Sequence, residues 1–205
     1  MLELKGIIDR EALSLVDLCL LCAKKTSSLL FLDIETEGLS KEKNDITLIG
    51  IYTQGKYLPF IKGFNLERSL SLLKASPVWV TFGGERFDLP FIKKRFSDLS
   101  MPVVHLDLYI LSSFVGLKGG LKKIEKALGI NRETDGMNGY DAVKLWQRWI
   151  EAKDKRALRK LILYNKEDVV NLKKIFEYVV NKLVEQKGEG QKGGGKDEVN
   201  RLVAF

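Results

Sequence analysis

The chain has 205 residues, of which 45% are hydrophobic and 30% are charged, and its formal net charge is +7. These values are typical of one soluble globular domain, and the positive charge favours an anionic partner such as nucleic acid. No apolar run reaches membrane-spanning length and the N-terminus lacks a signal-peptide pattern. We therefore expect no membrane partner and a cytoplasmic location.

Hydrophobic periodicity and turn residues predict the elements of the fold. In chain order these are a helix over 9–25, a strand from 29, a hairpin over 45–61, a helix over 65–75 with Asn65 as N-cap, and a strand over 78–82. They continue with a helix over 87–96, a strand over 102–108, and helices over 121–129, 140–152 and 154–186, the last with an expected break near Tyr164.

The order of these elements predicts an α/β fold. Three strands come first, strands then alternate with helices, and helices follow, which indicates a mixed sheet covered by helices on both faces. We assign residues 1–186 to the domain, with 1–28 as an N-terminal helical extension, and 187–205 to a flexible glycine-rich tail. The apolar tip within 196–205 is either a docking peptide for a protein partner, a contact between copies of the chain, or a disordered end.

The two cysteines and the single histidine do not suggest a metal site. Cys19 and Cys22 form a C-x-x-C pattern, but the chain has no second cysteine pair, and His105 is far away in sequence. We expect both cysteines to face the core from a helix. His105 lies outside any catalytic pattern, and we expect a structural role for it.

Acidic residues interrupt the apolar stretch LLFLDIETEGL. Asp33 and Glu35 are two residues apart in a strand, so they point to the same face, and buried carboxylates require a cationic side chain or a metal ion. Asp88 follows the strand at 78–82 where a helix begins. Tyr164 and Asp168 are four apart, hence on one helix face. Taken singly, each of these residues could equally be a helix cap or a surface charge.

Together, the four carboxylates predict a metal site. Hard oxygen ligands of this kind suit Mg²⁺ or Mn²⁺, and two such ions can activate a water molecule and stabilise the leaving oxygen in phosphodiester cleavage. A fifth acid, Asp107, is expected to cap a helix and is not included. The basic clusters 93–95 and 122–126 either follow phosphates or are solvated helix faces.

Three segments carry a resemblance to a known family. FLDIETEGL, FGGERFDLP and YNKEDVV resemble the motifs of the DEDD exonucleases of the RNase H-like superfamily, in the branch with tyrosine in its third motif. The sister branch has histidine five residues before the last aspartate, where this chain has Leu163. Gly83 stands where the second motif often has asparagine. The resemblance covers about residues 29–180 and implies a five-stranded sheet in the order 3-2-1-4-5 with strand 2 antiparallel.

The resemblance also implies a reaction, the 3′→5′ removal of nucleotides. Tyr164 would position the attacking water, and two Mg²⁺ or Mn²⁺ ions would be held by Asp33, Glu35, Asp88 and Asp168. Further residues are expected to contact the substrate, and these are Thr36, Gly38, Leu39, Phe87 and Lys122. Aromatic stacking on unpaired bases favours single-stranded DNA as the partner, with RNA as the other option.

A catalytically silent nucleic-acid-binding or scaffold domain, recruited through the tail, is the alternative function. The intact acidic set favours the exonuclease, because a module that only binds has no reason to concentrate negative charge where phosphates must lie.

Overall fold

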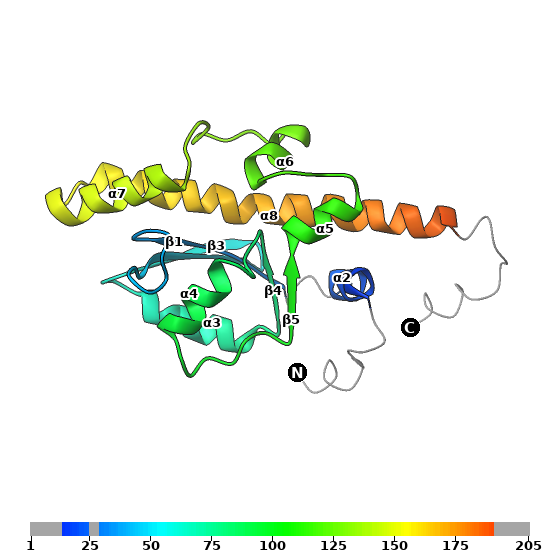
Figure 1. The fold of residues 1–205 in the computed structure, drawn as a ribbon, viewed down its shortest axis with the longest axis horizontal. Coiled ribbons are helices and arrows are strands. Elements are labelled where there is room, and N and C mark those ends of the chain that lie inside the picture. Colours follow the sequence, from blue (N-terminus) through cyan, green and yellow to red (C-terminus); the bar gives the residue numbers. More distant parts are fainter. Residues whose placement is uncertain (1–13, 25–28, 191–205) are drawn as a thin grey trace.

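Five strands form one mixed sheet in the order β3-β2-β1-β4-β5 (Figure 1). β2 is antiparallel to both β1 and β3, whereas the β1–β4 and β4–β5 pairs are parallel. The predicted mixed sheet, its strand order and its antiparallel second strand are therefore confirmed. The strands are β1 (Leu29–Thr36), β2 (Ile46–Thr53), β3 (Lys56–Ile61), β4 (Val78–Thr81) and β5 (Val104–Asp107).

The computed structural model describes residues 14–24 and 29–190. The remaining parts of the expected N-terminal helix and of the tail, including its apolar tip, lie outside these residues. Among the described helices, none is both long enough and apolar enough to cross a membrane.

Helices cover both faces of the sheet (Figure 1). α8 packs along one face against β1, β2 and β3, and α3 and α4 lie on the other. α6 and α7 both contact α8. The helices are α2 (Leu15–Ala23), the 3₁₀ turn η2 (Leu66–Arg68), α3 (Ser69–Ala75), α4 (Asp88–Arg95), α5 (Leu108–Phe114), α6 (Leu121–Ala127), α7 (Gly139–Ala152) and α8 (Lys155–Gly190).

β1 is buried on both faces, which explains its nearly continuous apolar sequence. Phe31 belongs to the core under α8, where its ring lies 5.7 Å from that of Phe176, whereas Leu32 belongs to the core on the opposite face. Side chains alternate along a strand, so Asp33 and Glu35 follow Phe31 on the face that α8 covers. The strand thereby directs both carboxylates toward the helix that carries the third motif.

The predicted break of the last helix near Tyr164 is wrong. α8 is one continuous helix over Lys155–Gly190, and it extends past the domain boundary that we placed at residue 186. Its apolar side packs on four strands, β1 to β4, and on α2, α5, α6 and α7. Tertiary packing of this kind stabilises a long helix that periodicity alone would divide.

Asn65 does not cap a helix through its side chain, contrary to the prediction. Its Oδ1 accepts a hydrogen bond from the backbone N–H of Ile61 at 2.7 Å, and its Nδ2 donates to the carbonyl of Pro59 at 3.2 Å. The side chain therefore binds the end of β3, and the following helix begins as a 3₁₀ turn.

The cysteines and the histidine have the structural surroundings that we predicted. Cys19 and Cys22 are free and buried in α2, and burial raises the pKa of their thiols to about 12 and about 11. His105 Nε2 lies 2.8 Å from Thr81 Oγ1 and thus links β5 to β4.

Gly50 permits the close approach of α8 to β2. It pairs with Asp33 in the sheet, and a Cβ atom at this position would lie 1.8 Å from Oδ1 of the buried Asn165 and 3.0 Å from Cγ2 of Val169. Glycine therefore leaves the space that Asn165 occupies next to the acidic strand.

We expect Gly50→Ala to lower the free energy of unfolding by about 1–3 kcal/mol, because the added methyl group overpacks this contact. Urea denaturation measures the change. Gly139→Ala is the matched control, since a Cβ atom there meets nothing within 4 Å. Equal stability of Gly50→Ala and the wild-type protein would contradict this account.

Candidate active site

Three carboxylates converge between β1 and α8. One oxygen from each of Asp33, Glu35 and Asp168 lies within 4.8 Å of the others. Asp33 is half-buried, and Glu35 and Asp168 are buried. The structure thus brings Asp168 next to two acids that precede it by more than 130 residues in the chain.

Asp88 approaches the same strand from α4. Its Oδ1 accepts a hydrogen bond at 3.1 Å from the backbone N–H of Ile34, which lies between Asp33 and Glu35. β4 pairs with β1 only as far as Phe31, so the edge of β1 beyond that point has no strand neighbour on this side. The Asp88 carboxylate satisfies the exposed amide, although Asp88 is outside the group of three oxygens within 4.8 Å.

Asp107 organises the turn that precedes Asp88. Its carboxylate accepts hydrogen bonds from the backbone N–H groups of Gly83 at 2.7 Å and Tyr109 at 2.9 Å. The second bond caps α5, as predicted for Asp107, although α5 itself was not predicted from the sequence. Gly83 has φ 71°, a left-handed conformation that glycine and asparagine tolerate best. Gly83 can therefore form the same turn as the asparagine that the family motif often has at this position.

Asn165 is a site neighbour that the sequence analysis missed. Its Nδ2 donates hydrogen bonds to Asp33 Oδ2 at 2.9 Å, to the Asp33 carbonyl at 3.2 Å and to Glu35 Oε1 at 3.4 Å. The Tyr57 hydroxyl donates to Asn165 Oδ1 at 2.9 Å, which leaves the amide nitrogen directed at the acids. In the sequence, the one indication that Asn165 belongs to the site was its position directly after Tyr164.

Two cationic side chains, Lys122 and Arg132, lie next to Tyr164. Lys122 Nζ donates to the Tyr164 hydroxyl at 3.0 Å and also binds the Met137 carbonyl. The guanidinium carbon of Arg132 lies 5.3 Å from the centre of the Tyr164 ring, and its Nη1 lies 2.5 Å from Asp168 Oδ1. Lys122 was predicted as a substrate contact, and the structure places it next to the tyrosine. Arg132 was missed, because it belongs to an irregular loop without periodicity.

Burial raises the pKa of all four carboxyl groups. The pKa values of Asp33 and Glu35 lie well above the ordinary range, first from burial and then from the negative charge of Asp168. Burial also raises the pKa of Asp88 to about 7 and that of Asp168 to about 6, where the Arg132 guanidinium opposes the rise. Without a compensating cation, the folded chain keeps protons that the unfolded chain would release.

The donor set fits a hard divalent cation. All four acids offer oxygen ligands. Among the residues that the structure describes, Arg132 is the one cationic side chain that forms an ion pair with any of them. A divalent ion would offset both the desolvation and the mutual repulsion that raise the pKa values. Asp33, Glu35, Asp88 and Asp168 are the residues that could hold it.

The other residues that we predicted to contact the substrate differ in how exposed they are. Thr36 is buried and donates to the carbonyl of Gly38 at 2.7 Å, so its hydroxyl shapes the turn after β1. Leu39 is 85% exposed at that turn. The Phe87 ring lies 4.9 Å from that of Phe91, a core residue, and is partly buried.

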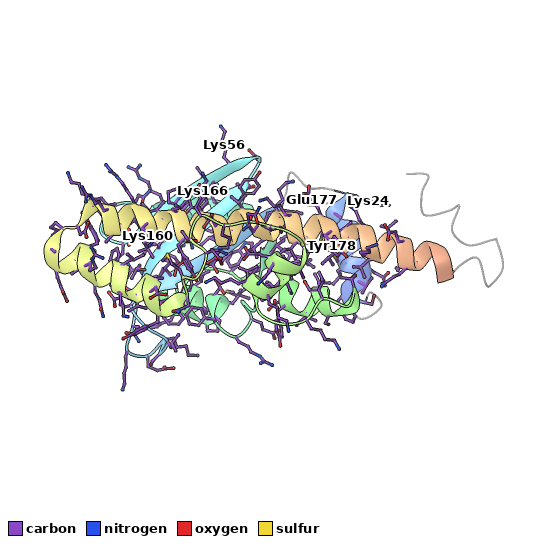
Figure 2. All side chains as sticks on the ribbon, turned by 90° about the horizontal axis from the view of Figure 1, so that it is seen from above. Lys24, Lys56, Lys160, Lys166, Glu177 and Tyr178 are labelled. Atoms are coloured by element: carbon purple, nitrogen blue, oxygen red, sulfur yellow. The ribbon has the colours of Figure 1, made fainter. Side chains whose placement is uncertain are left out.

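The basic cluster over 93–95 is used within the fold. Lys94 donates to carbonyls of the β1–β2 connection, among them that of Asn44 at 3.1 Å, and Arg95 pairs with Glu67 at 2.6 Å. Further exposed lysines lie along α8, among them Lys160 and Lys166 (Figure 2).

In the presence of a chelator at pH 8, we expect Asp33→Asn to stabilise the protein, because one buried negative charge is removed. Each kcal/mol of added stability should raise the unfolding temperature by about 2–4 °C. The pKa of Asp33 is raised in the folded state, so its ionisation destabilises the fold increasingly as the pH rises above the pKa of the unfolded chain. The rise in unfolding temperature caused by Asp33→Asn should therefore be smaller at pH 5 than at pH 8. Thermal denaturation at both values measures the effect, with the exposed Asp98→Asn as control. An unchanged or lower unfolding temperature at pH 8 would contradict the electrostatic account.

Comparisons with known proteins identify a matching sequence family and similar folds. A sequence profile described as the RNase H superfamily matches residues 30–180. No curated protein sequence matches the chain. Among similar solved structures, the family B DNA polymerase of the archaeon Pyrobaculum calidifontis has 16% identity and a TM-score of 0.54 over 77% of this chain and 24% of its own.

Two further solved structures are also similar to this chain. Brucella melitensis NrnC bound to pGG has 17% identity and a TM-score of 0.50, over 84% of this chain and 90% of its own. Escherichia coli RNase D, an exoribonuclease involved in structured RNA processing, has 14% identity and a TM-score of 0.53, over 84% of this chain and 46% of its own. The chain thus spans about a quarter of the polymerase and about half of RNase D.

At these identities the structural likeness concerns the fold alone. The sequence profile goes further, because it covers most of the chain and includes the segments that carry all four acids. The chain belongs to the RNase H superfamily.

Proposed function

We propose that this protein is a divalent-metal-dependent 3′→5′ exonuclease of the tyrosine-containing DEDD type. The observation that carries the proposal is the convergence of Asp33, Glu35 and Asp168 within 4.8 Å, in an RNase H superfamily fold. Asp88 approaches the same strand, and Tyr164 lies one helical turn before Asp168. Buried carboxylates in this number are costly without a cation, and phosphodiester cleavage is a reaction that such a cation assists.

The four acids would hold two Mg²⁺ or Mn²⁺ ions, which supply a nucleophilic water at neutral pH and stabilise charge on the leaving oxygen. The chain itself fixes the ligands. The backbone N–H of Ile34 binds the Asp88 carboxylate, and the Asn165 amide binds Asp33 and Glu35. These bonds keep the acids in place before the substrate arrives, so less reorganisation is needed during the reaction.

Tyr164 would act as a hydrogen-bond donor to the attacking water. Burial raises the pKa of its hydroxyl, and the charges of Asp168 and Glu35 raise it further, so the phenol keeps its proton at neutral pH. Lys122 donates to the phenol oxygen at 3.0 Å, which leaves the phenol proton available for another acceptor. The tyrosine therefore orients a water molecule and does not remove its proton.

The proposed substrate is a single strand of nucleic acid with a free 3′ end, with DNA preferred and RNA as the competing class. Leu39 is 85% exposed beside the first motif and offers an apolar surface to an unpaired base. The similar structures include both a DNA polymerase and an exoribonuclease, so their names do not separate the two substrates.

End-labelled single- and double-stranded DNA and RNA, each with Mg²⁺, Mn²⁺ or chelator, test the proposal. We expect stepwise shortening from the 3′ end with either metal, faster on single strands, and none in chelator or with Asp168→Ala, which removes one ligand of the acidic site. Full cleavage in chelator would refute the metal mechanism. Metal binding without any cleavage would favour the silent nucleic-acid-binding domain.

Tyr164→Phe should lower kcat about ten- to a thousandfold with little change in KM, because the hydroxyl acts mainly in the transition state. Steady-state kinetics on the best oligonucleotide measures both constants. Tyr52→Phe, which removes the hydroxyl of a partly buried tyrosine outside the acidic site, is the matched control. An unchanged kcat in Tyr164→Phe would mean that the hydroxyl has only a structural role.

A further inference from the structure

We propose that Arg132 is a positioning residue of the acidic site, and that it acts as a buried pair with Glu125 to hold Asp168 and Tyr164 for metal binding and catalysis. The inference rests on the proposed function and assigns a role to two residues that the motifs do not contain.

Arg132 contacts both functional residues of the third motif. Its Nη1 lies 2.5 Å from Asp168 Oδ1, and its Nη2 donates to the backbone carbonyl of Tyr164 at 3.3 Å. The guanidinium carbon also lies 5.3 Å from the centre of the Tyr164 ring. One planar group thereby fixes a carboxylate and an aromatic side chain that lie on successive turns of α8.

Arg132 is itself held by a second buried layer. Glu125 accepts hydrogen bonds from Arg132 Nη1 at 2.9 and 3.0 Å, and Asn171 Nδ2 donates to Glu125 at 2.7 Å. The Arg132 and Glu125 side chains are 4% and 2% exposed. Because neither end of the pair is free to move into solvent, the position of the guanidinium relative to Asp168 is well defined.

The pair also connects α6 to the site. Glu125 lies three residues after Lys122 on α6, and Lys122 binds the Tyr164 hydroxyl. α6 and the loop after it lie over α8, on the side away from the sheet (Figure 1). The third motif is thus held from two sides, by the sheet below and by α6 with its loop above.

Stability alone gives little reason for such a pair. Replacing a buried ion pair by well-packed apolar residues is often neutral or stabilising, because the desolvation of two charges offsets their attraction. What an apolar pair could not do is bind the Asp168 carboxylate and the Tyr164 carbonyl. Groups beyond the metal ligands that orient those ligands typically contribute 10–100-fold to metal affinity or activity.

The competing interpretation is that Arg132 occupies Asp168 in place of a metal ion and so opposes metal binding. The two interpretations predict opposite changes in metal affinity. A single substitution of Arg132 would not distinguish the two interpretations. It would leave Glu125 as an unpaired buried anion, which attracts cations by itself. Removing both charges together leaves the net charge unchanged and isolates the effect on geometry.

The experiment is therefore the double variant Glu125→Gln/Arg132→Gln, studied by calorimetric titration with Mn²⁺ and by steady-state cleavage of a labelled single strand. We expect Mn²⁺ affinity to fall by about 10–100-fold and kcat at saturating Mn²⁺ to fall as well, with KM for the oligonucleotide changed less than about twofold. Arg148→Gln/Asp154→Asn is the matched control, since it removes an ion pair outside the acidic site, with side chains 64% and 21% exposed, and should change neither quantity.

Equal Mn²⁺ affinity and kcat in the double variant would overturn the proposal, and tighter Mn²⁺ binding would overturn it in favour of competition. If circular dichroism shows the double variant to be unfolded, Arg132→Lys replaces it. This variant keeps the charge, but one ammonium group cannot reproduce the planar contacts of a guanidinium, so we expect the same losses at about three- to tenfold; unchanged values would again refute the role. Wild-type protein that neither binds Mn²⁺ nor cleaves would refute the proposed function instead.

Discussion

The burial of four carboxylates around the end of β1 is the constraint on which the rest of this structure depends. Burial in a poorly solvated place favours protonation and raises the pKa values of Asp88 and Asp168, and the negative charge of Asp168 raises those of Asp33 and Glu35 further. The surrounding chain compensates with specific donors: the Ile34 amide, the Asn165 side chain and the Arg132 guanidinium. These donors fix where each acid lies, and the proposed divalent cation would complete the compensation.

The fold delivers the acids through two rigid elements. β1 is enclosed by sheet neighbours and by helices on both faces, so the alternation of its side chains directs Asp33 and Glu35 to α8. α8 continues without a break through the third motif and therefore presents Asn165 and Asp168 at fixed helical positions. Gly50 lets the helix approach the sheet closely enough for Asn165 to reach Asp33. Functional groups on a strand and a helix are held more precisely than groups on loops.

Less regular parts of the chain then adjust this framework. The turn at Gly83, bound by Asp107, sets the entry to α4 and hence the position of Asp88. The loop that carries Arg132 reaches Asp168 from the side opposite the sheet. Both contacts come from segments whose sequence has no helical or strand periodicity, and both act on residues that the motifs identify.

The sequence by itself determined most of the elements and the mixed sheet, because hydrophobic periodicity is a local property. It also pointed to the acids that meet in the sheet, because Asp33 and Glu35 alternate on one strand and three segments resemble the family motifs. It misplaced what depends on contacts between distant segments. Asn65 binds β3 where a helix cap was expected, and packing on the sheet makes α8 continuous where a break was expected. Asn165, Arg132 and Glu125 could not be identified as site neighbours, since their roles are defined by side chains that only the tertiary fold brings within hydrogen-bonding distance.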